Sequence, residues 1–326
     1  MRRREFITLL GAAATWPLLA HAQHQDKPVI GFLSARSAVE SAHLVDAFRN
    51  GLAEYGVSEG QNVSIDYSWA DSHYERLPGE ASNFVSRQVT VLVAVGGDMT
   101  ARAAISATRT IPIVAVFIGD PVASGFVTSL NQPGGNITGV SNLNAVIEAK
   151  RLGLLRDLKP EISTVGALLN PDSPTVVSQQ TEIEEAARTV GLRVQFFKVS
   201  SDAELETTFK SMVEDRIPAL LVPADAFFAA SRGRLAELAA RNAIPAIYSL
   251  REAAVSGGLM SYGNDLPDTY RIIGTYAARI IKGAKAADLP VIQPTKFQFV
   301  LNLKTAKALR LIIPPGVLAI ADEVLE

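Results

Sequence analysis

Polar and glycine residues follow the predicted strands of this chain at the points where the strands end. The residues that we expect to contact a ligand are, in chain order, Ser34, Arg36, Gly97, Asp98, Asp120, Asn170, Asp225, Arg251 and Tyr262. Ligands of open parallel sheets bind beyond the carboxyl ends of the strands. As a set, these residues therefore predict one shared ligand cleft. Taken singly, an Asp, Asn or Ser at such a place is explained equally well as a helix N-cap or a turn former.

An amino acid is a ligand whose two charges these residues would satisfy. Backbone N–H groups after Gly97 and near Asp120, helped by Ser34 or Arg36, would take a carboxylate at a helix N-terminus. Asp225 would take the ammonium group and would face an open cleft without ligand. Each ligand charge needs a partner because both leave water when the cleft closes.

Signatures of catalysis are absent from the sequence. No G-x-G-x-x-G run follows the first strand, and no Walker-type sequence or nucleophile elbow occurs. The absence of cysteine excludes thiol chemistry and disulfides, and none of His21, His24, His43 and His73 is spaced for a metal site. We therefore predict a binding protein with no catalytic residue, metal or cofactor; an exported α/β enzyme is the less favoured alternative.

Length and composition predict two globular units. The chain has 326 residues, 48% of them hydrophobic and 20% charged, which suits two buried cores. The formal net charge of -2 and the lack of a basic block argue against a nucleic-acid partner.

The first 22 residues have the pattern of a signal peptide. Three arginines at 2–4 precede a short apolar run over 6–19, and Ala20-His21-Ala22 is a small-x-small cleavage site. The Arg pair suggests twin-arginine (Tat) export, and an ordinary Sec signal is the alternative. We expect a soluble periplasmic protein that is not a lipoprotein, because no cysteine is present to carry a lipid.

Strand and helix patterns alternate along the chain and then recur in the same order. Apolar runs at 29–33, 89–95 and 111–117 predict buried strands in the first half, and runs at 164–169, 219–222 and 245–250 match them in the second. Such a duplicated βαβ array predicts an α/β fold of two Rossmann-like lobes with parallel sheets. Trp69 follows the second strand and either edges the cleft or packs into the core, with packing favoured.

Several runs of the sequence resemble the substrate-binding proteins of ABC transporters. They are the segments 3–11, 28–34, 111–114, 119–122, 133–141, 258–263 and 302–309. The resemblance implies a type I periplasmic binding protein, whose two lobes are joined by a hinge of three crossings. It places residues 28–138 and 258–285 in lobe 1, and residues 139–257 and 286–326 in lobe 2.

The same resemblance implies delivery of a small molecule to a membrane permease, with hinge closure on the ligand. We expect the protein to be a monomer. The alternative to transport is that it presents its ligand to a sensor or chemoreceptor instead of a permease. Some relatives bind aromatic or branched amino acids. Asp98-Met99 stands where relatives often have Thr-Pro, and Asp98 would repel an anion there.

Overall fold

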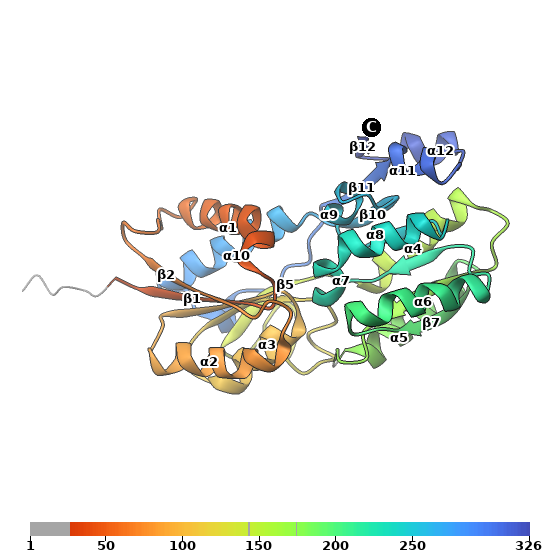
Figure 1. Ribbon diagram of the computed structural model, residues 1–326. Helices are drawn as coiled ribbons and strands as arrows, with labels where there is room; N and C mark the ends of the chain where they lie inside the picture. The colour runs from red at the N-terminus through yellow and green to blue at the C-terminus, as the bar shows by residue number, and fades with distance from the viewer. Residues whose placement is uncertain (1–26, 143, 174) are drawn as a thin grey trace, which may run out of the picture.

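The structure is a computed structural model that describes residues 27–142, 144–173 and 175–326. It contains two sheets, each with helices on both faces, placed side by side in an elongated molecule (Figure 1). The predicted signal peptide lies outside the described residues. Within the described ranges, no helix is long and apolar enough to cross a membrane.

Lobe 1 is built on a five-stranded parallel sheet in the order β2-β1-β3-β4-β5. Its strands are β1 (Val29–Ser34), β2 (Ser64–Trp69), β3 (Val91–Val95), β4 (Ile113–Phe117) and β5 (Ile137–Ser141). Its helices are α1 (Ala38–Ala53), η1 (Tyr74–Arg76), α2 (Leu77–Ser86), α3 (Asp98–Ala107), α10 (Leu266–Ile281) and η2 (Ala286–Asp288). Every residue of β3 is buried, as expected for a strand covered on both faces.

Lobe 2 is built on a seven-stranded sheet in the order β12-β11-β10-β9-β8-β6-β7. Its strands are β6 (Thr164–Leu169), β7 (Arg193–Lys198), β8 (Leu220–Val222), β9 (Ala246–Tyr248), β10 (Met260–Asn264), β11 (Phe297–Asn302) and β12 (Glu323–Leu325). Its helices are α4 (Asn144–Leu158), α5 (Val176–Thr189), α6 (Asp202–Glu214), α7 (Ala226–Ala230), α8 (Arg232–Arg241), α9 (Arg251–Val255), α11 (Leu303–Ala308) and α12 (Pro315–Ala319). The predicted α/β fold with two lobes is confirmed, except that β11 runs antiparallel to β10.

Three boundaries expected from the sequence were wrong. Strand β10 lies in lobe 2, because it pairs with β9 and β11, and the chain crosses to lobe 1 only afterwards. Strand β5 lies in lobe 1, where it pairs with β4. The segment 286–292 also belongs to lobe 1, since Ala286 and Leu289 are buried in its core and Ile292 bridges Val140.

Helices α1 and α10 pack side by side on one face of the first sheet (Figure 1). Their close approach depends on Gly51 and Gly274. A Cβ at Gly51 would lie 1.9 Å from the Arg271 carbonyl oxygen, and one at Gly274 would lie 2.1 Å from that of Phe48. The contact holds α10 against lobe 1, and α10 brings its first residues to the edge of the ligand cleft.

Candidate ligand-binding site

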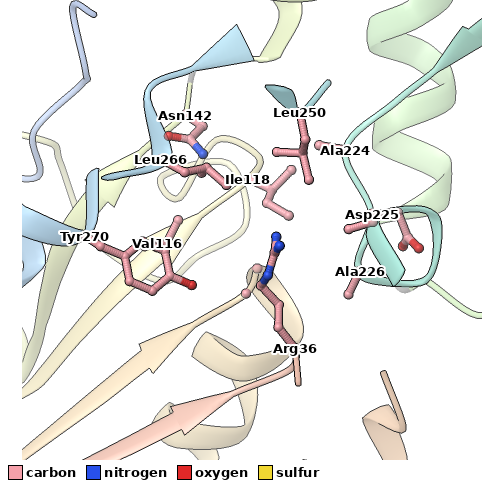
Figure 2. A pocket seen from close by; sticks show the side chains of 13 residues that line it. Arg36, Val116, Ile118, Asn142, Ala224, Asp225, Ala226, Leu250, Leu266 and Tyr270 are labelled. Carbon is pink, nitrogen blue, oxygen red and sulfur yellow. The ribbon is translucent and has the colours of Figure 1, made fainter. Parts of the chain in front are cut away.

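A cleft lies between the lobes, at the carboxyl ends of β1, β3, β4, β8 and β9 (Figure 2). We call its main part the Arg36 compartment. Its lining consists of Arg36, Gly96, Gly97, Val116, Ile118, Asn142, Ala224, Asp225, Ala226, Ala229, Leu250, Leu266 and Tyr270. Most of these side chains are apolar, and the few polar ones come mainly from lobe 1. The compartment thus offers an apolar wall with localised charge, which is typical of small-molecule sites.

Arg36 places a buried cation in this compartment. The residue follows β1, and its backbone N–H donates to Ser34 Oγ at 3.1 Å, which fixes the turn out of the strand. Its side chain is 6% exposed, its Nε has no hydrogen-bond partner, and it forms no ion pair with any carboxylate in the described ranges. Figure 2 shows the guanidinium in the middle of the compartment. A buried charge without a counter-ion is costly, so the geometry suits an anionic ligand group.

Two further polar groups lie on the lobe 1 side of Arg36. The Tyr270 hydroxyl is directed toward Arg36 in Figure 2, and burial raises the pKa of Tyr270 to about 12, so the phenol stays a donor. Asn142, in the first crossing between lobes, has a buried Oδ1 without a partner in the described part of the chain. The Arg36 guanidinium, the Tyr270 hydroxyl and Asn142 Nδ2 can each donate to one carboxylate, whereas Asn142 Oδ1 can only accept a hydrogen bond.

Asp225 is the N-cap of α7 and is 9% exposed. Its Oδ1 accepts from the Phe227 N–H at 2.8 Å, and both of its oxygens accept from Asn170 Nδ2. Burial raises the pKa of this carboxyl group, while these hydrogen bonds oppose the rise. In Figure 2 the carboxylate points away from the Arg36 guanidinium, which keeps the two charges in separate parts of the cleft.

The cleft continues past Asp225 into a second part, which we call the Tyr74 compartment. It shares Gly96, Gly97, Ile118, Ala224, Asp225 and Ala226 with the first, and adds Tyr74, Asp98, Met99, Ser173 and Thr175. Gly96 and Gly97 have φ of 94° and 119°, values that favour glycine, and they lead into the N-terminus of α3.

Asp98 supports the wall between these compartments. Its carboxylate accepts from the backbone N–H groups of Ile118 at 3.0 Å and Gly119 at 3.1 Å, and the residue is 4% exposed. Burial raises the pKa of Asp98, and the two backbone hydrogen bonds lower it. Asp98 lines the Tyr74 compartment with its oxygens directed at the β4–β5 loop, and its expected repulsion of a ligand anion stays a prediction.

The structure brings some of the predicted contacts together and separates others. Arg36, Gly97, Asp98 and Asp225 line the cleft, Ser34 lies beneath Arg36, and Asn170 reaches Asp225. The other three lie outside both compartments and correct the expectation: Asp120 is exposed and caps a turn at Val122, Arg251 pairs with Glu323 at 2.6 Å, and Tyr262 stacks on Phe297.

Sequence reasoning missed Tyr74, Asn142, Leu266 and Tyr270. Tyr74 begins η1 and Tyr270 lies in the first turns of α10, so neither directly follows a strand, and Asn142 lies in a crossing without a sequence pattern. A tyrosine in the first turns of such a helix is a weak signal, since its hydroxyl needs a polar partner when it is buried.

Polar contacts join the two lobes around the cleft. Glu40 of α1 forms an ion pair with Arg232 of α8, and His43 Nε2 lies 3.0 Å from Glu252 Oε1. On another side, Ser72 Oγ donates to the Ala226 carbonyl at 3.4 Å. The lobes are therefore in contact on two sides of the cleft. Across the described ranges, no cluster of three or more His, Asp or Glu side chains could hold a metal ion.

The fold and the interlobe cleft define the class of type I periplasmic binding proteins. Within this class the chain belongs to the family "ABC transporter substrate binding protein", which matches residues 29–325. The "Tyrosine-binding protein" of Clostridioides difficile (strain R20291) is 29% identical over 262 residues, which cover 80% of this chain and 75% of that protein.

Two solved structures show how the chain compares with known conformations. An ABC domain in complex with L-Trp from Streptococcus pneumoniae is 28% identical, with a TM-score of 0.84 and coverage of 92% of this chain and 100% of that one. The ligand-free, open structure of a substrate binding protein from Clostridium difficile is 27% identical, with a TM-score of 0.68 over 91% of this chain and 99% of that one. The better agreement with the ligand complex accords with the contacts between the lobes.

Proposed function

We propose that this substrate-binding protein is exported, acts as a monomer outside the cytoplasm, and delivers an amino acid with a large apolar or aromatic side chain to the permease of an ABC importer. The observation that carries the ligand class is the unpaired Arg36 guanidinium in a compartment whose lining is mostly apolar. Relatives that bind tyrosine and L-Trp support it.

Each part of the ligand has a partner in this proposal. Arg36, Tyr270 and Asn142 bind the carboxylate, and Asp225 binds the ammonium group from the Tyr74 compartment. The apolar wall formed by Val116, Ile118, Leu250 and Leu266 takes the side chain. Arg36 comes from lobe 1 and Asp225 from lobe 2, so a zwitterion favours closure of the hinge. Small-angle scattering would then show a smaller radius of gyration in the ligand-bound protein.

Isothermal titration calorimetry on the chain without residues 1–22 tests the ligand class. The panel contains L-tyrosine, L-tryptophan, L-phenylalanine and L-leucine, together with tyramine and tryptamine, which lack the carboxylate. We expect at least one amino acid to bind and the amines to bind far more weakly. Equal binding of an amine and its parent amino acid would contradict the proposal.

The Arg36→Met variant tests whether Arg36 binds the ligand carboxylate. Loss of one partner from a buried charged pair costs about 2–5 kcal/mol, so affinity should fall about 30-fold or more. The ligand-free variant should be at least as stable as wild type, because it no longer buries an unpaired cation. Arg251→Met is the matched control, since Arg251 pairs with Glu323 outside the cleft. Affinity of Arg36→Met within threefold of wild type would remove Arg36 from the site.

Uptake of the labelled amino acid by cells with and without the protein tests the transport role. Loss of uptake without the protein supports delivery to a permease. Unchanged uptake with a lost chemotactic response would instead indicate service to a chemoreceptor.

A further inference from the structure

Tyr74 connects lobe 1 to the proposed ammonium site in lobe 2. It begins η1, shortly after β2, and its hydroxyl donates to Asp225 Oδ2 at 3.3 Å. Burial raises the pKa of Tyr74 well above its usual range, so the phenol remains a donor at physiological pH. The contact joins two residues from different lobes and exists only when the lobes approach each other.

The segment that carries Tyr74 is fixed by its backbone. The Ser72 N–H donates to the Ala35 carbonyl at 2.7 Å, and the His73 N–H donates to the Ala70 carbonyl at 2.8 Å. Asp71 and Ser72 have φ of 52° and 65°, in the left-handed region that residues with a side chain seldom adopt. Surrounding contacts must therefore maintain it. Ala35 immediately precedes Arg36, so the hydrogen bond from Ser72 to Ala35 fixes the position of the Tyr74 segment relative to Arg36, the proposed carboxylate contact.

The two carboxylate oxygens of Asp225 accept hydrogen bonds from different sets of donors. Oδ1 is occupied by the helix cap, since it accepts from the N–H groups of Phe227 and Phe228 as well as from Asn170. Oδ2 accepts only from Tyr74 and Asn170 among the described residues. Asn170 Nδ2 is shared between Oδ1 at 3.2 Å and Oδ2 at 3.3 Å, so only Tyr74 is a donor to Oδ2 alone, and a ligand donor in the Tyr74 compartment can take the place of the shared contact on Oδ2.

We propose that Tyr74 is a positioning residue for ligand specificity: it holds Asp225 Oδ2 in place as an acceptor in the closed protein, so that the cleft selects ligands that carry an ammonium group. The inference rests on the proposed function and extends it, because it assigns recognition of one ligand group to a residue of the opposite lobe. Tyr74 does not need to touch the ligand for this role.

The test compares a ligand with its analogue that lacks the amino group. Calorimetry is run with L-tyrosine against 3-(4-hydroxyphenyl)propionate, and with L-tryptophan against indole-3-propionate. In wild type the amino acid should bind more tightly than its analogue. Tyr74→Phe should weaken amino-acid binding about tenfold or more, as for the loss of a hydrogen bond to a charged group, and should leave the analogue within threefold.

Tyr276→Phe is the matched control, because the Tyr276 hydroxyl donates to the Pro290 carbonyl at 2.7 Å, away from the cleft. Equal losses for the amino acid and its analogue would overturn the inference and leave Tyr74 as a general contact between lobes. Unchanged affinity for both in Tyr74→Phe would also overturn it. A wild-type protein that binds none of the amino acids would overturn the proposed function itself, and the inference with it. Thermal unfolding of each variant verifies that it is folded.

Discussion

Arg151 Nη1 lies 2.5 Å from Glu148 Oε1, and neither side chain is more than 3% exposed. Arg151 Nε also donates to the Tyr262 carbonyl at 2.6 Å. Both residues lie in α4, directly after the first crossing between the lobes, and Tyr262 lies in β10, just before the second. Arg151, held by this buried ion pair, therefore links the segments beside two crossings of the hinge through its hydrogen bond to Tyr262.

Replacement of Arg151 by Met should destabilise the fold by about 3–5 kcal/mol, because it leaves the Glu148 carboxylate buried without its partner. Urea unfolding followed by circular dichroism measures this loss. The double variant Arg151→Met/Glu148→Met should recover part of it, since no buried charge remains. Arg234→Met, which removes an exposed pair with Glu237 and Glu206, should leave the urea midpoint close to that of wild type. An equal effect of Arg151→Met and Arg234→Met would contradict the burial argument.

The packing of α1 on α10 gives a second prediction, at Gly51. Alanine normally stabilises a helix interior by about 0.5–1 kcal/mol relative to glycine. At Gly51 the new Cβ would overlap the Arg271 carbonyl, so Gly51→Ala should instead destabilise lobe 1 by about 1–3 kcal/mol. Gly153→Ala in α4 is the control, because a Cβ there meets no atom within 4 Å and should stabilise the protein. Stabilisation by both substitutions would show that the helices separate at little cost.

Asp225 caps α7 and is also the proposed contact of the ligand ammonium group, and two substitutions distinguish these roles. Asp225→Ala removes the acceptor of the Phe227 N–H and should lower the free energy of unfolding by about 1–2 kcal/mol. Asp225→Asn keeps an oxygen for the cap and should cost much less stability, because Asn is also a good N-cap. Both variants lose the charge and should bind an amino acid more weakly than wild type. Chemical unfolding together with calorimetry separates the two effects; full affinity in Asp225→Asn would exclude Asp225 as the ammonium contact.

The architecture was predictable because it depends on repeated local patterns. Fully apolar runs such as Val91–Val95 predict strands covered on both faces, and their recurrence predicts two lobes. The lobe boundaries were less predictable, because β10 has the same local pattern whichever sheet it joins. Its place is decided by pairing with β9 and β11, which are distant contacts in the sequence.

The site was predictable only where a residue directly follows a strand. Arg36 and Asp225 were found by that rule, and Arg251 satisfied it but is neutralised by Glu323 from the end of the chain. The roles within the site depended on details that the sequence does not contain. Asp225 was expected to face an open cleft, yet it is buried as a cap. Trp69 packs against Phe32 and Tyr67 in the lobe 1 core and lies outside both compartments.

Glu182 of α5 gives a prediction about pH. Partial burial, together with the charges of Glu148, Asp98 and Asp120, raises its pKa from 4.5 to about 7. In the unfolded chain the pKa returns to its ordinary value, so between about pH 4.5 and pH 7 the folded protein holds a proton that the unfolded chain has released. The stabilising effect of this proton is complete below the unfolded pKa and is lost as the pH rises through the folded pKa.

Glu182→Gln should therefore make the free energy of unfolding less dependent on pH. Wild type should lose more stability than the variant between pH 5 and pH 8, because Gln cannot become a charge beside the other carboxylates. Urea midpoints at the two pH values measure the difference. Glu184→Gln on the same helix is the control; Glu184 is exposed and accepts a hydrogen bond from Gln180. Its pH dependence should match that of wild type. If Glu182→Gln also matches wild type, neither burial nor the neighbouring carboxylates raise the pKa of Glu182 in the folded protein.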